Sequence, residues 1–144
     1  MTRFPLCLTA VLALLTACTP TSAARNDPAP ADRSVTLAWQ QEATVDGLSV
    51  QFVGYRDSRC PSDVTCVWAG EAHAFVWVAG PGIEPHVVSL PWRGGAGGTP
   101  PQDVQRVGAH TLWLDSLEPH PHSAGKAPPG NYRVVLKVGG AVAE

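Results

Sequence analysis

The stretch NYRVVLKV (residues 131–138) decides the fold class. Its apolar side chains recur at every second position, the period of a β-strand with one face in a core and the other in solvent. The inward set is Tyr132, Val134, Leu136 and Val138, and the outward charged residues are Arg133 and Lys137. The sequence therefore predicts a half-buried strand near the C-terminus.

The same period of two recurs along most of the chain after residue 33. It predicts strands at 34–40, 48–55, 71–79, 86–90 and 111–117, with a weaker one at 104–107. No window of twelve residues carries a helical apolar stripe free of Gly and Pro. Six or seven short strands predict an all-β domain over residues 34–140, a two-sheet antiparallel β-sandwich, immunoglobulin-like or similar.

Composition limits the kinds of partner. The 144 residues include 14 Gly, 14 Pro and only 15% charged residues, which fits one domain of strands joined by turns. Lys and Arg number 10 against 12 Asp and Glu, and they form no basic run. Since a nucleic-acid surface needs clustered positive charge, we expect no nucleic-acid partner.

The first eighteen residues have the pattern of an exported protein. Arg3 gives a positive start, and the apolar run 4–14, at about eleven residues, is far shorter than the ~20 that a membrane-spanning helix needs. The run ends in Leu15-Thr16-Ala17-Cys18, which resembles the lipobox of bacterial lipoproteins. The resemblance implies that 1–17 is a signal peptide and that Cys18 carries the lipid anchor. The alternatives are an ordinary signal peptide with an accidental Cys, or a leader that is never processed.

Residues 18–33 then predict a lipidated Cys followed by a disordered tether. Apart from Arg25 and Arg33, residues 19–33 are Pro, Ala, Ser, Thr, Asn and Asp without apolar periodicity, and they reach roughly 20 to 45 Å. In lipoproteins of two-membrane bacteria, an Asp directly after the lipidated Cys usually retains the protein in the inner membrane. By that resemblance, Thr19 implies the outer membrane.

Two other cysteines remain after such processing, Cys60 and Cys66. Six positions apart on the oxidising side of a membrane, they predict one disulfide. The spacing is not that of C-x-x-C, which argues against a thioredoxin-like role. A zinc site would need further ligands, and His73 is the only candidate within ten residues.

The disulfide lies within an unusual motif, Asp57-Ser58-Arg59-Cys60-Pro61, Cys66 and then Trp68-Ala69-Gly70-Glu71-Ala72. It resembles an uncharacterised family of small bacterial secreted proteins and lipoproteins with a DSRCP-x4-C-x-WAG-x-A signature. The likeness extends to residues 47–52, 117–121 and 132–134, except that His120 stands where an aromatic residue, often Tyr, is usual. The resemblance implies the fold and a secreted location, and it implies no activity.

We call residues 57–72 the stapled loop. Asp57 is placed to accept backbone N–H bonds, and Arg59 to pair with Asp57 or Asp63. We expect Trp68 to cover the disulfide and Gly70 to supply a backbone angle that other residues resist. These roles are structural, and the alternative is that the loop is a rigid recognition tip.

Weaker candidates lie elsewhere. His120 and His122 are two apart, so in an extended segment both rings would face the same way, a geometry that suits copper or zinc. Residues 91–93 (Pro-Trp-Arg) and the glycine-rich run 94–98 suggest an inhibitor of secreted peptidases. The run 94–98 lacks the Lys and Ser/Thr of a phosphate-binding loop, so we expect a flexible connection.

The sequence contains neither G-x-S-x-G nor H-E-x-x-H, and we expect no enzyme and no cofactor. The favoured interpretation is a non-enzymatic envelope lipoprotein that binds a protein, glycan or cell-wall partner through its loops. The alternatives are a periplasmic metal-binding lipoprotein, for copper or zinc, and a peptidase inhibitor.

Overall fold

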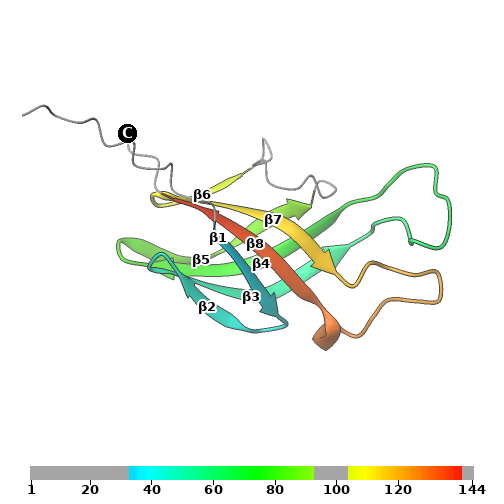
Figure 1. Cartoon of the computed structure of the whole chain (residues 1–144), viewed down its shortest axis with the longest axis horizontal. Coiled ribbons are helices and arrows are strands. Elements are labelled where there is room, and N and C mark those ends of the chain that lie inside the picture. Colours follow the sequence, from blue (N-terminus) through cyan, green and yellow to red (C-terminus); the bar gives the residue numbers. More distant parts are fainter. Residues whose placement is uncertain (1–32, 93–103, 141–144) are drawn as a thin grey trace, which may run out of the picture.

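The computed structural model describes residues 33–92 and 104–140, and it is a β-sandwich (Figure 1). One antiparallel sheet has the order β1-β8-β7-β6 and the other β2-β3-β4-β5. The strands are β1 (Arg33–Ala38), β2 (Glu42–Val45), β3 (Leu48–Asp57), β4 (Ala72–Gly80), β5 (Ile83–Trp92), β6 (Gln105–Val107), β7 (His110–Glu118) and β8 (Arg133–Gly139). The predicted fold class is confirmed.

Several predictions lie outside the described residues. They concern the signal peptide 1–17, the lipidation of Cys18, all but the last residue of the tether, and the glycine run 94–98. Within 33–92 and 104–140, no helix has the length and apolar character needed to cross a membrane.

The structure adds one strand that the pattern missed. β2 is a four-residue, half-polar segment whose alternation is too short to detect, and it pairs with β3 across a two-residue turn. The turn residues Asp46 and Gly47 have φ of 52° and 79°, the left-handed values that a tight hairpin requires. Several predicted bounds shift by two or three residues. β5 runs from Ile83 to Trp92, and β8 begins at Arg133 because the short 3-10 turn η1 (Pro129–Asn131) precedes it.

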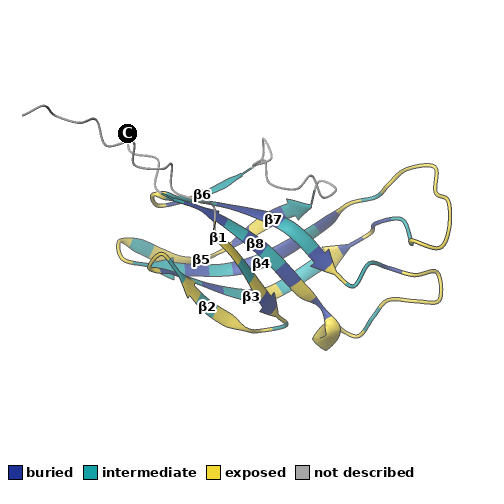
Figure 2. Cartoon of the chain, viewed as in Figure 1, coloured by how far each residue is buried: buried dark blue, intermediate teal, exposed yellow. Residues whose placement is uncertain are grey.

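The inward residues of both sheets form a single core, dark blue in Figure 2. The four inward residues predicted for 131–138 are each at most 1% exposed, which confirms the alternation read from that stretch. In β7 three consecutive residues, Leu112, Trp113 and Leu114, are all buried.

A β-bulge in β3 places Asp57 inside the molecule. Phe52 pairs with Val76 but Gly54 pairs with Phe75, so Val53 is an extra residue in the ladder. Because side chains alternate in direction along a strand, one extra residue reverses which positions face inward. Even-numbered residues are buried up to Phe52, and beyond the bulge the buried position is Asp57.

β7 carries a second bulge, between Leu114 and Ser116, which turns Leu117 into the core. The stapled loop leaves β3 and a long loop leaves β7 at the same end of the sandwich (Figure 1). Arg33 lies at the opposite end, since β1 starts against Val138 and finishes against Arg133. The chain thus enters the sandwich at one end and presents its two long loops at the other.

Candidate functional site

A buried ion pair forms the base of the stapled loop. The Arg59 guanidinium donates from Nε to Asp57 Oδ1 at 2.9 Å and from Nη2 to Oδ2 at 2.8 Å. The Arg59 backbone N–H also donates to Asp57 Oδ1, at 3.2 Å. Both side chains are at most 2% exposed, so this bidentate pair is screened from water. The predicted pairing of Arg59 with Asp57, and the predicted backbone bond to Asp57, are confirmed.

Arg59 also joins two other parts of the molecule to this base. Nη2 donates to the Pro119 carbonyl at 3.2 Å, and the guanidinium carbon lies 5.2 Å from the Trp92 ring centroid, a cation–π contact. Pro91 and Trp92, which suggested an inhibitor loop, belong to β5. Trp92 thus serves as a wall of the base.

Two tyrosines continue the base into the core. The rings of Tyr55 and Tyr132 stack with centroids 4.0 Å apart. The Tyr132 hydroxyl is buried and has no hydrogen-bond partner among the described residues. Burial raises the pKa of Tyr132, and the negative charge of Asp57 raises it further. The hydroxyl therefore stays protonated at neutral pH.

The neck of the stapled loop is closed by covalent and backbone contacts. Cys60 and Cys66 form the predicted disulfide, with Cα atoms 5.9 Å apart. Two backbone bonds of 2.8 Å, Ser58 N–H to the Glu71 carbonyl and Cys60 N–H to the Ala69 carbonyl, draw the two sides together. Gly70 has φ +74°, and a Cβ there would lie 2.0 Å from the Ser58 carbonyl oxygen. The neck therefore requires glycine at Gly70, as the sequence predicted.

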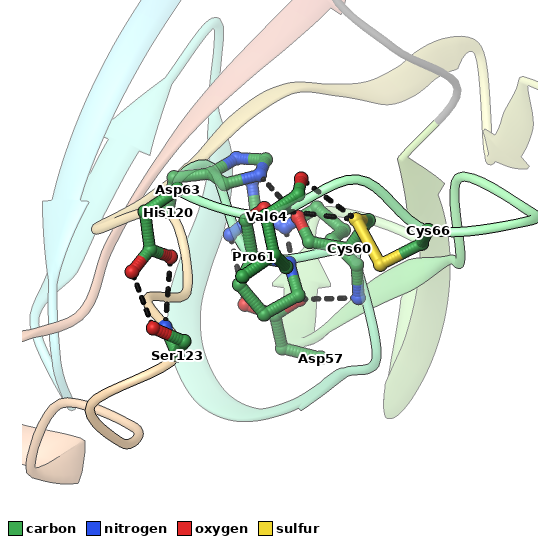
Figure 3. Close-up of a disulfide and its surroundings, with 9 residues drawn as sticks. Asp57, Cys60, Pro61, Asp63, Val64, Cys66, His120 and Ser123 are labelled. Atoms are coloured by element: carbon green, nitrogen blue, oxygen red, sulfur yellow. Dashed lines mark hydrogen bonds and ion pairs between the residues drawn. A yellow bond between two sulfur atoms is a disulfide. The ribbon is translucent and has the colours of Figure 1, made fainter.

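The closing loop, which we define as residues 119–128, is hydrogen-bonded to the stapled loop. The Ser62 N–H donates to the Pro121 carbonyl at 3.0 Å. The Asp63 carboxylate accepts the Ser123 backbone N–H at 2.8 Å and also the Ser123 hydroxyl, as Figure 3 shows. The hydroxyl bond, followed by the backbone bond, lowers the pKa of Asp63 from its ordinary value of 3.8. The two loops thus form one unit, although they come from different sheets.

The two histidines of the closing loop each contact the stapled loop. His120 Nε2 donates to the Cys60 carbonyl at 3.0 Å, and His122 Nδ1 lies 3.3 Å from Ser62 Oγ. The two rings therefore have separate hydrogen-bond partners, whereas the sequence suggested that both could face one copper or zinc ion. Among the described residues, no group of three or more His, Cys, Asp or Glu side chains is placed to hold a metal ion.

Three apolar side chains of the stapled loop point into solvent: Val64, Val67 and Trp68, which we call the apolar tip. Trp68 is 65% exposed, Val64 is 46% exposed and Val67 is fully exposed. Trp68, which we expected to cover the disulfide, is mostly exposed, and the aromatic wall of the base is Trp92 from β5. In Figure 2 the far part of this loop is largely yellow. The interior of the unit holds the two loops together, and its outer surface is exposed to solvent.

Comparison with protein-family models, with curated proteins and with solved structures finds no match for this chain. A surface cavity of about 630 Å³ lies at the same end, between the end of β7 and the start of β8, and Tyr132 and Arg133 line it. The apolar tip is the more distinctive feature, because exposed Trp and Val together on a fixed loop are typical of a contact surface.

Proposed function

We propose that this protein is a lipid-anchored module of the bacterial envelope that binds a partner through the stapled loop without catalysing a reaction. The observation that carries the proposal is the apolar tip on a fixed base. A loop held by an ion pair, a disulfide and cross-loop hydrogen bonds loses little conformational freedom on binding. Exposed Trp and Val on such a support are typical of a recognition surface.

The location rests on the N-terminal pattern, in which the lipobox ending at Cys18 implies a lipid anchor and Thr19 implies the outer membrane. The tether gives the sandwich room to stand away from the bilayer. An anchored module with a rigid contact surface fits a role in holding an envelope protein, a glycan or the cell wall.

The test separates binding from stability. In the full chain, Val67→Ser with Trp68→Ala should leave the free energy of unfolding within about 0.5 kcal/mol, because exposed side chains support little of the fold. The same variant should lower the amount of envelope partner retained by at least ~10-fold, as expected for loss of an aromatic anchor. Val87→Ser, which removes an exposed valine from β5, is the matched control and should change neither measurement.

Retention unchanged in the tip variant would refute the assignment of the binding surface. A large fall in the unfolding midpoint would instead show that the tip supports the fold.

A further inference from the structure

We propose that the partner is a protein with an apolar pocket rimmed by Lys or Arg, into which the apolar tip inserts. This inference rests on the proposed function and narrows it to one class of partner. It follows from four properties of the stapled loop: its exposed charge, the direction in which it points, the chemistry of its exposed side chains, and its size.

The charge exposed on the stapled loop is negative. Its four charged residues include one cation, Arg59, which is buried against Asp57. The side chains that reach solvent are Asp63, 43% exposed, and Glu71, 55% exposed. The seven residues 64–70 between them carry no charge. An apolar centre flanked by carboxylates is complementary to an apolar pocket with a basic rim.

The direction of the loop argues against the bilayer that holds the anchor. The stapled loop leaves the sandwich at the end opposite Arg33, where the tether arrives. When the tether is extended, the tip therefore faces away from that bilayer. Exposed carboxylates beside the tip also oppose contact with anionic lipid.

The side-chain chemistry favours a protein over a glycan. Sugars present hydroxyl groups that need hydrogen-bond partners when they are buried. Val64 and Val67 offer none, and Trp68 is the only aromatic residue of the stapled loop on which a sugar could stack. The tip is also small: three side chains are far less than the roughly 800 Å² per partner of a stable flat interface. An anchor that fills a pocket suits this size better than a second copy of the chain does.

The experiment is photo-crosslinking in intact cells of the bacterium that makes the protein. The probe is Thr65→p-benzoylphenylalanine in the full chain, since Thr65 is exposed between the tip residues and leaves all three in place. The same probe at Glu84, exposed at the opposite end, is the positional control. Three treatments identify the class of partner in each adduct: protease removes a protein, muramidase removes cell wall, and lipid extraction removes lipid.

We expect the probe at position 65 to give one discrete adduct, in which the chain is crosslinked to a second protein. The probe at position 84 should give no adduct. Trp68→Ala should lower its yield at least ~10-fold. Glu71→Lys should lower it several-fold and high salt should weaken it, because both remove attraction to a basic rim. Glu42→Lys, an equal charge change on β2, should leave the yield unchanged.

A Trp68-dependent adduct that muramidase or lipid extraction removes would overturn this inference and leave the proposed function standing. A Trp68-dependent protein adduct that Glu71→Lys does not weaken would overturn the basic rim. No adduct at position 65, or one indifferent to Trp68→Ala, would refute both the inference and the proposed function.

Discussion

Single residues decide whether the stapled loop can close, and Gly70 is the clearest example. Gly70→Ala places a Cβ 2.0 Å from the Ser58 carbonyl and also adopts a left-handed φ. We predict a loss of more than ~2 kcal/mol in the free energy of unfolding, because the clash adds to the ~1–2 kcal/mol cost of the angle. Gly82→Ala is the control in denaturant unfolding. Gly82 has φ +71° but open space around it, so this variant pays only the cost of the backbone angle, without a clash.

If the two glycine variants unfold at the same denaturant concentration, the contact between the two sides of the neck contributes nothing to stability.

The buried ion pair gives a second prediction at this scale. Asp57→Ala leaves the Arg59 guanidinium buried without its carboxylate, which should cost about 3–5 kcal/mol. The half-buried pair of Lys137 and Asp115, 3.7 Å apart, is the comparison, and Lys137→Ala should cost less than ~1 kcal/mol. Chemical denaturation measures both, and equal costs would contradict the role given to the base.

At the scale of elements, the sequence predicts strands well and their irregularities poorly. Alternation of apolar residues indicates most strands and the inward residues of β8, because burial on one face imposes that period. It is silent on the extra residue Val53, since Leu48 to Phe52 alternates in the same way with or without a bulge after it. The inward turn of Asp57 therefore needs the structure. So does the exposure of Trp68, because sequence spacing does not reveal that Trp92, from another strand, lies under Arg59.

The link between the two loops depends on pH through Asp63. Its pKa is lowered in the folded state, so the bond to Ser123 contributes stability above pH 3.8 and loses it as pH falls through the folded pKa. We predict that the Ser123 amide resonance in NMR spectra moves when pH is lowered from about 5 to about 2, while the Leu136 amide stays in place. In Ser123→Ala the transition should shift to higher pH, because the largest cause of the lowered pKa is gone. A Ser123 resonance that is constant over this range would contradict the Asp63 bond.

At the scale of the whole molecule, the two ends of the sandwich have different roles. β1 begins at the end where the tether arrives, and the stapled and closing loops occupy the other end (Figure 1). Strand pairing and core packing hold the two ends in a fixed arrangement. The fold therefore sets the position of the stapled loop relative to Arg33. In the proposed function, this arrangement holds the contact surface at a distance from the anchor.

The anchor itself is tested by Cys18→Ala in the full chain. We predict that the variant leaves the membrane fraction, because acyl chains contribute ~0.8 kcal/mol per buried CH₂ and the predicted tether is polar. Detergent phase partitioning measures the change, and Cys7→Ala is the control that should leave the protein with the detergent. A Cys18→Ala protein that loses residues 1–17 and still partitions with detergent would refute the lipoprotein proposal.

The bond between Asp63 and Ser123 joins residues sixty positions apart. This separation sets the order in which the contacts of the stapled loop can form. The disulfide joins residues only six positions apart, so its formation does not require the closing loop. The stapled loop takes its final form only after β7 and β8 have paired, since contacts distant in sequence wait for the chain between them. A chain that stops after β7 can carry the disulfide and still lack a fixed tip. The fixed position of the tip thus depends on the closing loop, which is made after most of the sandwich.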